Sequence, residues 1–246
     1  MRLIKINATN STNSFLKELA QNSSLEEYTI AVANTQTSGR GQMSNSWISE
    51  PYKNLTFSIF TPLTKLKIKH QAYLNFAVSL AIYDTLLTYN VPKLSIKWPN
   101  DIMSAEKKIC GILIETTFSH LQIKNTIIGI GLNVNQEKFP KKLFNASSLK
   151  NILKKEIDLE PLMNTIVEKT KYRISSIESG KFSQTHEEYH EALYKRGIPT
   201  AFVDKKTKLL FMGIITGVSS IGNLQIQLED DTIGEYGLKE VSFAKV

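Results

Sequence analysis

A short polar loop between two apolar runs contains the residues best suited to hold an anion. Gly39, Arg40 and Gly41 lie between the apolar residues 28–33 and 55–60. Glycine lets the main chain approach a ligand closely, and the planar arginine guanidinium offers paired donors to a carboxylate or a phosphate. For Gly-Arg-Gly alone we favour a mobile hairpin connection with a chance arginine. The loop becomes a candidate site only if other residues join it.

Charged residues of opposite sign follow at the ends of two predicted strands. Residues 94–98 predict a strand that the following proline ends, because proline cannot continue a central strand, so Asn100 and Asp101 are presented at its end. Lys108 begins the next apolar run, 109–115. If the two strands pair as a hairpin, the Asp101 carboxylate and the Lys108 ammonium meet.

Two further sets of residues each have a structural and a functional interpretation. Ser11, Thr12 and Asn13 precede a helical pattern, where an N-cap residue belongs. Capping explains one of these side chains and is favoured when the set is taken alone, but all three could face a ligand at the helix N-terminus. Gly129 and Gly131 interrupt an apolar run, which indicates either a β-bulge or close approach by a ligand or another backbone.

Hydrophobic periodicity predicts the elements that position these residues. Helices are predicted after Ser11 and at 71–89, 159–177 and 182–194. Strands are predicted at 2–6, 28–33, 55–60, 94–98, 109–115 and 123–134. From residue 198 onward the pattern is typical of a small barrel, with strands at 200–203, 209–218, 224–228, 232–236 and 239–243. We expect a domain boundary near 195–197.

Composition limits the broad class of protein. The chain has 246 residues, 41% of them hydrophobic, so it can bury a sizeable core, and its single cysteine, Cys110, excludes an intrachain disulfide framework. No signal core follows Met1 and no apolar run is long enough to span a membrane, so we expect a cytoplasmic location and no membrane partner. The net charge of +7 comes from scattered lysines, which disfavours a nucleic-acid-binding module.

Taken in order, these segments resemble the biotin protein ligases over essentially the whole chain. The most specific match is the pentapeptide Lys-Trp-Pro-Asn-Asp at 97–101. Weaker matches are 11–13, 38–41 with Trp47, 108–113, 129–135 and 145–149. The resemblance implies an α+β fold of the biotin/lipoate ligase type. It implies a mixed-sheet catalytic domain at 1–196 and a small C-terminal SH3-like β-barrel at 197–246.

The resemblance also implies a reaction in two steps. The biotin carboxylate attacks the α-phosphorus of ATP to give biotinyl-5′-AMP and pyrophosphate, and a lysine of a biotin carrier domain then takes the biotinyl group. Both steps concentrate negative charge, so fixed cations are needed where the charges meet. In this interpretation Lys108 bridges the carboxylate and the α-phosphate, and Arg40 holds phosphate oxygens and closes the loop. Asp101 orients Lys108, helps to place Mg²⁺ and assists deprotonation of the acceptor lysine.

The implied binding residues form two overlapping sets. For biotin they are Ser11, Thr12, Asn13, Gln36, Gly39, Arg40, Gly41, Gln42, Lys108, Gly111 and Gly131. Gly111 and Gly131 would leave room for the biotin ring and chain. For ATP they are Arg40, Trp47, Lys97, Asn100, Lys108, Asn133 and Asn145. Biotin and ATP with Mg²⁺ are then substrates, no tightly bound cofactor is expected, and the protein is expected to be a monomer or weak homodimer.

The sequence departs from the family pattern at two places. Met43 and Ser44 follow Gln42 where the family loop carries arginine or glycine, which puts tight retention of the intermediate in doubt. The chain also begins directly at the predicted first catalytic strand. We therefore expect a short form without the N-terminal DNA-binding domain of the repressor-type members, and no DNA binding.

Two other enzyme classes are open at this point. His186, Glu187 and His190 fit the His-Glu-x-x-His pattern of zinc hydrolases, although no later histidine completes a metal shell. A lipoate or octanoate ligase or transferase would share the fold, but residues 97–101 and the loop at Gly39 favour biotin. Cys110 as an acyl nucleophile is disfavoured, because a free cysteine in an apolar strand is commonly buried. ATP would be bound without a P-loop, since no Walker motif occurs.

Overall fold

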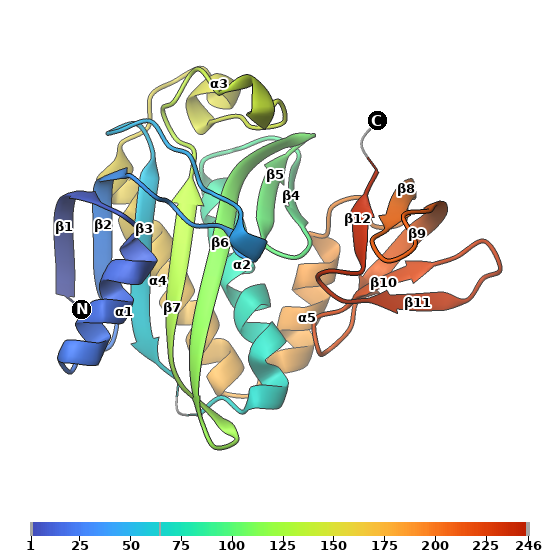
Figure 1. Ribbon diagram of the computed structural model, residues 1–246, viewed down its shortest axis with the longest axis horizontal. Coiled ribbons are helices and arrows are strands. Elements are labelled where there is room, and N and C mark those ends of the chain that lie inside the picture. The colour runs from blue at the N-terminus through green and yellow to red at the C-terminus, as the bar shows by residue number, and fades with distance from the viewer. Residues whose placement is uncertain (1, 64, 245–246) are drawn as a thin grey trace.

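The chain folds around two β-sheets, which lie side by side in the computed structural model (Figure 1). The structure describes residues 2–63 and 65–244. Within these ranges seven strands form the first sheet and five form the second. Met1 and residues 245–246, which the predicted domain ranges include, lie outside the described residues.

The first sheet has the strand order β1-β2-β3-β7-β6-β5-β4 within the described residues. Its strands are β1 (Arg2–Thr9), β2 (Thr29–Gln36), β3 (Leu55–Pro62), β4 (Leu94–Lys97), β5 (Asp101–Ser104), β6 (Lys107–Ser119) and β7 (Gln122–Leu132). β1 and β2 are parallel, and the other neighbouring pairs are antiparallel. Helix α1 (Thr12–Asn22) supplies the crossover that a parallel pair requires. The predicted α+β class with a mixed sheet is confirmed.

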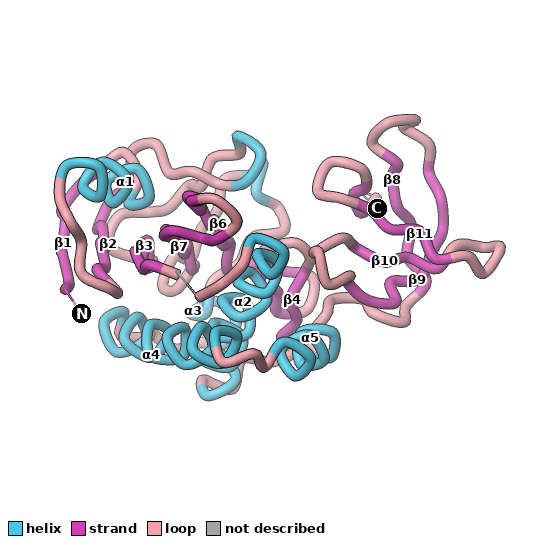
Figure 2. Tube along the Cα trace, turned by 90° about the horizontal axis from the view of Figure 1, so that it is seen from below, coloured by secondary structure: helices cyan, strands magenta, loops and turns pink. Residues whose placement is uncertain are grey.

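Helices cover both faces of the first sheet (Figure 2). α1 lies on one face, and the other face is covered by α2 (Gln71–Thr88), α4 (Leu159–Glu178) and α5 (Phe182–Glu191). Alternation along the strands explains the two layers, because Phe60 and Ile127 pack with Leu16 of α1, whereas their neighbours Ile59 and Ile128 belong to the larger core. Among the described helices, none is both long and apolar enough to cross a bilayer.

Short elements appear where the sequence predicted loops. They are β5, the helix α3 (Leu149–Leu153) and the 3₁₀ turns Gln42–Ser44, Ile68–His70 and Lys141–Leu143. β5 pairs with both β4 and β6, so the strands predicted at 94–98 and 109–115 do not pair with each other directly. Four residues show too little alternation to be recognised as a strand. β5 was not predicted because the chain reverses within the turn at residues 98–100, directly after β4.

The helix predicted at 182–194 ends earlier, at Glu191. The residues that follow pair with the edge strand β4. The Ile96 N–H donates to the Ala192 carbonyl at 2.7 Å, and the Tyr194 N–H donates to the Ile96 carbonyl at 2.9 Å. An open sheet edge offers unpaired backbone groups, and hydrogen bonds to these groups replace the hydrogen bonds of the predicted last helical turn.

The C-terminal strands form a sheet with the order β11-β10-β9-β8-β12 in the described part of the chain. They are β8 (Pro199–Asp204), β9 (Leu210–Val218), β10 (Leu224–Gln227), β11 (Ile233–Tyr236) and β12 (Val241–Phe243), and all neighbouring pairs are antiparallel. No ladder joins the edge strands β11 and β12 among the described residues. The sheet is therefore open, and the predicted closed barrel is not confirmed.

Candidate active site

A cavity of about 340 Å³ lies between the two sheets and the glycine loop, which we define as residues 37–54 between β2 and β3. Its volume is in the range typical of small-molecule sites. The predicted site residues that line it are Ser11, Thr12, Asn13, Gln36, Arg40, Gly41, Gln42, Trp47, Lys97, Asn100, Asp101, Lys108, Gly111 and Gly131. Gly39, Asn133 and Asn145 were also predicted, but they do not line this cavity.

The N-terminus of α1 forms a neutral polar end of the cavity. Ser11 occupies the N-cap position, but its side chain makes no capping hydrogen bond. The Thr12 N–H instead donates to Gln36 Oε1 at 2.8 Å. Ser58 Oγ lies 2.7 Å from Thr12 Oγ1 and 2.6 Å from Asn13 Oδ1. The capping interpretation is therefore wrong for the Ser11 side chain, and this end presents hydroxyls and amides to a ligand.

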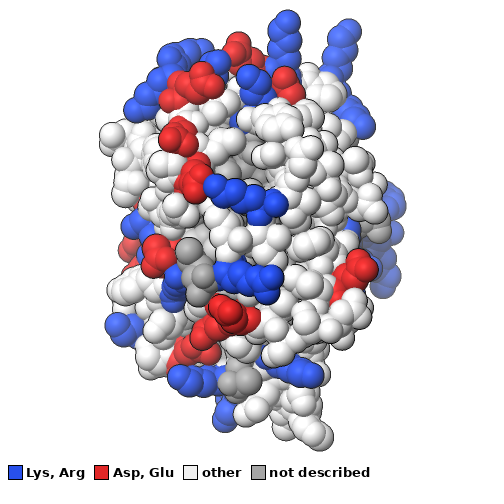
Figure 3. Space-filling model, turned by 90° about the vertical axis from the view of Figure 1, so that its left-hand side faces the viewer, with Lys and Arg blue, Asp and Glu red and all other residues white. Residues whose placement is uncertain are grey.

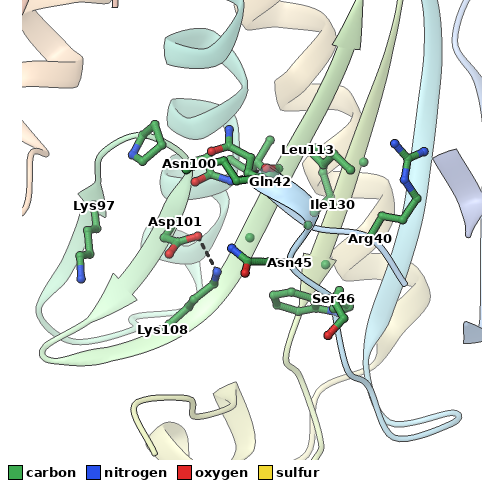
Figure 4. Close-up of a pocket in the computed structure, with 18 of the residues that line it drawn as sticks. Arg40, Gln42, Asn45, Ser46, Lys97, Asn100, Asp101, Lys108, Leu113 and Ile130 are labelled. Carbon is green, nitrogen blue, oxygen red and sulfur yellow. Dashed lines mark hydrogen bonds and ion pairs between the residues drawn. The ribbon is translucent and has the colours of Figure 1, made fainter. Parts of the chain in front are cut away.

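Asp101 and Lys108 form a charged end of the same cavity (Figure 4). Lys108 Nζ lies 2.6 Å from Asp101 Oδ1, so the predicted meeting of carboxylate and ammonium is present, across β5 and β6. The Lys108 backbone is held by the segment that precedes α3. Its N–H donates to the Asn145 carbonyl at 2.8 Å, and its carbonyl accepts from the Ser147 N–H at 3.0 Å. Asn145 thus acts through its main chain in this structure.

Lys97 adds a second cation to the charged end. Its Nζ lies 4.4 Å from the ring centroid of Phe243 and 5.6 Å from that of Tyr194. Burial lowers the pKa of the Lys97 ammonium, and the nearby Asp101 carboxylate offsets part of this effect. A desolvated cation gains from an additional anion, so this end favours an anionic ligand.

Arg40 does not join the charged end. Its Nη2 donates to Glu115 Oε1 at 2.8 Å, and its Nη1 donates to Glu115 Oε2 at 3.2 Å. Figure 4 shows the Arg40 side chain pointing away from Lys108 and Asp101. In this conformation the guanidinium is paired with a carboxylate of β6, where the sequence predicted a contact with phosphate.

Trp47 fills the space above the glycines of β6 and β7. A Cβ atom at Gly131 would lie 2.4 Å from Trp47 Cε2, and one at Gly111 would lie 3.0 Å from Trp47 Cζ3. A Cβ at Gly129 would lie 2.3 Å from Asn13 Oδ1. These glycines are therefore closely approached, but not by the ligand or backbone that the sequence predicted for Gly129 and Gly131. The groups that approach are side chains of the protein itself, and the room expected for biotin above Gly111 and Gly131 holds the indole.

The glycine loop closes on itself where the sequence departs from the family pattern. The Gly41 N–H donates to the Asn45 carbonyl at 2.7 Å, and the Trp47 N–H donates to the Gly39 carbonyl at 2.8 Å. Met43, inside this turn, has a left-handed φ of 53°. The side chain of Ser44 lies outside the described part of the structure. The loop therefore keeps an ordered turn without the basic residues.

Two of the predicted ATP ligands use their amides to join neighbouring segments. Asn100 Nδ2 donates to the Ile112 carbonyl at 2.6 Å, and Asn133 Nδ2 donates to the Ser147 carbonyl at 3.0 Å. Asn100 still lines the cavity, whereas Asn133 is buried behind it. Both side chains hold together the segments that carry the charged end.

Several residues of the site were not predicted from the sequence. Ser58 and Glu115 lie within apolar strand runs, where a single polar residue looks like ordinary alternation. A polar side chain in a strand that is otherwise buried was the available signal. The second sheet also contributes to the wall, through Leu224, Val241, Ser242 and Phe243, and Leu238 lines it from the segment between β11 and β12. No local pattern indicates that contact, because it depends on how the two sheets pack.

Comparison with known proteins shows the family of this chain. Residues 6–133, about half of the chain, match the sequence model of the biotin/lipoate A/B protein ligase family. The chain belongs to this family. It is 34% identical over 159 residues to the bifunctional ligase/repressor BirA of Bacillus subtilis, a match that covers 63% of this chain and 48% of that protein.

Other relatives agree with the family assignment. The chain is 28% identical over 131 residues to the biotin–[acetyl-CoA-carboxylase] ligase of Mycobacterium tuberculosis, covering 52% of this chain and 47% of that protein. It spans about half the length of the curated relatives that it matches. In structure it is similar to the biotin protein ligase from Aquifex aeolicus in complex with biotin and ATP, with a TM-score of 0.83, 25% identity, and coverage of 100% of this chain and 99% of that one.

The structure gives no support for the zinc-hydrolase interpretation of His186, Glu187 and His190. His186 Nε2 and His190 Nε2 both lie at the Val218 carbonyl, at 2.6 and 2.9 Å. Among the described residues no group of three or more potential metal ligands occurs. Burial lowers the pKa of His190, which suits a neutral ring packed against β9. The two histidines therefore join α5 to the second sheet.

The environment of Cys110 disfavours a thiol nucleophile, and charges of both signs occur on one face of the molecule. Cys110 is fully buried in β6, and burial raises the pKa of its thiol, so it is not suited to act as an acyl nucleophile. On the face of the molecule drawn in Figure 3, basic and acidic side chains are interspersed. This agrees with scattered lysines as the source of the net positive charge.

Proposed function

We propose that this chain is an ATP-dependent biotin protein ligase that activates biotin as biotinyl-5′-AMP and transfers it to a lysine of a biotin carrier domain. The observation that carries the proposal is the chemistry of the two ends of the cavity. Biotin has a neutral ureido ring at one end and a carboxylate at the other. The hydroxyls and amides at the start of α1 suit the ring, and Lys108 with Lys97 suits the carboxylate and the phosphates.

Lys108 is the proposed catalytic cation of the first step. A carboxylate oxygen of biotin attacks the α-phosphorus, the new oxygen–phosphorus bond forms, and the bond to pyrophosphate breaks. The Lys108 ammonium offsets charge on both anions at the point where they meet, which is a preorganised electrostatic effect. Asp101, at 2.6 Å, keeps Lys108 in place until the ligands take over as its partners.

Asp101 is the proposed residue for Mg²⁺ and for the second step. It is the only carboxylate lining the cavity in the described residues, so Mg²⁺ would be held by Asp101 together with the phosphates of ATP. Bound there, the ion would neutralise phosphate charge. In the second step the neutral amine of the acceptor lysine attacks the carbonyl of the mixed anhydride and AMP leaves. Asp101 accepts the proton that the amine loses.

We further propose that residues 1–196 form the catalytic domain and that 197–246 form an SH3-like cap. An antiparallel five-stranded sheet that covers one wall of the cavity supports this division. Trp98 links the two parts, because its Nε1–H donates to the Gly222 carbonyl at 2.9 Å. A cytoplasmic location and a monomeric or weakly dimeric state stay predictions.

One assay tests the proposed function. The chain is incubated with ATP and Mg²⁺, and pyrophosphate release is measured with biotin, lipoate or octanoate as the acid. A biotin carrier domain is then added and its mass is measured. We expect release with biotin alone and a mass increase of one biotinyl group. Release that depends on lipoate or octanoate, and not on biotin, would contradict the proposal.

A further inference from the structure

The ion pair between Arg40 and Glu115 joins the glycine loop to the first sheet. Two N–H···O bonds, of 2.8 and 3.2 Å, join the two terminal nitrogens of one guanidinium to the two oxygens of one carboxylate. This bidentate geometry fixes direction as well as distance. Arg40 belongs to the loop and Glu115 to β6, so the pair fastens a connecting segment to a central strand.

The same two side chains also hold the start of α1. Arg40 Nη1 donates to Ser14 Oγ at 3.2 Å, and Glu115 Oε2 accepts from Asn13 Nδ2 at 2.8 Å. Asn13 lines the cavity at its neutral polar end. We call these four residues the loop clamp. It joins the glycine loop, β6 and the helix N-terminus at one point.

The electrostatics of the loop clamp keep it closed at neutral pH. Burial raises the pKa of Glu115, but the hydrogen bonds from Arg40 and Asn13 outweigh burial, so the pKa lies below its usual range. The carboxylate is therefore ionised and pairs fully with the guanidinium. Because Glu115 neutralises Arg40, this place has little charge to offer a triphosphate.

The cations that remain for an anionic ligand lie elsewhere in the cavity. Among the described residues the basic side chains lining it are Arg40, Lys97 and Lys108. Lys108 and Lys97 lie with Asp101 at the charged end, whereas Arg40 points away from it (Figure 4). Lys97 and Lys108 are therefore placed to contact an anionic ligand at the charged end, whereas Arg40 is not.

We propose that Arg40 is a positioning residue that acts through Glu115, and that its guanidinium stays on Glu115 and does not hold phosphate when ligands are bound. The inference deepens the proposed function and rests on it. By pairing with Glu115, Arg40 orders the loop over the cavity and helps to fix the Asn13 amide. Losing the clamp then weakens binding at the neutral polar end, which is the biotin end, more than binding of ATP.

A double-mutant cycle tests this directly, because residues that act through one another have non-additive effects. The variants are Arg40→Gln, Glu115→Gln and the double variant, all of which preserve side-chain size approximately. We expect each single variant to raise the KM for biotin about tenfold, the double variant to raise it about tenfold and not about a hundredfold, and the KM for ATP to stay within about twofold. The proposal would be overturned if the double variant raised the KM for biotin about a hundredfold. It would also be overturned if Arg40→Gln alone raised the KM for ATP about tenfold.

Two controls accompany the cycle. Lys5 and Glu160 form an exposed ion pair with an N···O distance of 2.9 Å, remote from the cavity lining, and the same cycle at that pair should leave both KM values unchanged. Thermal unfolding of each variant separates a loss of fold from a loss of the clamp. A variant that unfolds early is replaced by Arg40→Lys, which keeps the charge but not the paired donors.

Limited proteolysis of the ligand-free protein distinguishes failure of the inference from failure of the proposed function. We expect faster cleavage within 37–54 in Arg40→Gln and Glu115→Gln than in the unchanged chain, and no further increase in the double variant. If the unchanged chain releases no pyrophosphate with biotin, the proposed function fails but cleavage still reports on the clamp. If it is active and cleavage is the same in all four proteins, the clamp fails alone.

Discussion

Two ion pairs lie at the cavity, and they differ in the way that their tasks require. Lys108 and Asp101 make a single contact of 2.6 Å across neighbouring strands, at a place open to a ligand. Arg40 and Glu115 make two contacts between a loop and a strand. An ammonium is a compact point charge that can change partners, whereas a guanidinium fork holds one carboxylate in a fixed direction. We call Lys108–Asp101 the exchangeable pair, because it suits a catalytic role in which a ligand replaces one partner. We call Arg40–Glu115 the fixed pair, because it suits the ordering of a loop.

The largest expected effect comes from removing the exchangeable cation. Lys108→Ala should lower kcat/KM for biotin-dependent pyrophosphate release by about a hundredfold to a thousandfold, because a preorganised charge at the reacting atoms is lost. The neighbouring Lys107, whose Nζ donates to the Phe144 carbonyl at 3.0 Å, is the matched control, and Lys107→Ala should be nearly silent. Full activity in Lys108→Ala would remove the exchangeable pair from the mechanism.

A smaller effect is expected from displacing Trp47, whose ring lies beside Lys108. Lys108 Nζ is 5.6 Å from the Trp47 ring centroid, and a Cβ at Gly131 would lie 2.4 Å from the same ring. Gly131→Ala should displace the indole and lower kcat/KM by about tenfold, since overpacking costs about 1–3 kcal/mol. Gly111→Ala, with its nearest contact at 3.0 Å, should cost less. Equal losses in the two variants would show that Trp47 is not the group displaced.

Acid should open the fixed pair. The pKa of Glu115 is lowered in the fold, so its stabilisation is present above the unfolded pKa and is lost as the pH falls through the folded pKa. Protection of the glycine loop against an acid-active protease should therefore persist as the pH falls into the usual glutamate range and be lost below it. Arg40→Gln should lack this step. The same step in both proteins would assign it to another carboxylate.

The smallest expected effect concerns Lys97, the second cation at the charged end. The pKa of Lys97 is lowered by burial, so its charged form destabilises the fold at neutral pH, and this effect disappears as the pH rises above the unfolded lysine value. Lys97→Met should raise the Tm by about 2 °C at neutral pH while raising the KM for ATP a few fold. A lower Tm would mean that the contacts of Lys97 with the aromatic rings outweigh its desolvation.

Sequence alone predicted the parts of the site that carry a local chemical signature. Residues 97–101, the glycine loop and the glycines of β7 combine rare residue types at fixed spacing, and the cavity includes residues from all three segments. The long amphipathic or apolar runs were also placed correctly, because their periodicity survives in any tertiary context. Their ends were less well placed, as at 192–194, where the edge of β4 captured the chain.

The remaining parts depend on contacts between segments that are distant in sequence. Arg40 was recognisable as a donor, but its acceptor lies on β6, and Glu115 resembles any solvent-facing residue of an alternating strand. Ser58 orients Thr12 and Asn13 from the next strand but one, which no spacing reveals. The open second sheet was missed for the same reason, since closure depends on the pairing of its edge strands.

The wall that the second sheet contributes has a consequence for biosynthesis. Ser11 of the cavity is translated more than two hundred residues before Phe243, and both line the same space. The seven strands of the first sheet can pair before the last strands leave the ribosome, but the cavity is incomplete until β12 is added. A nascent chain therefore acquires its core early and its binding site only once β12 has emerged.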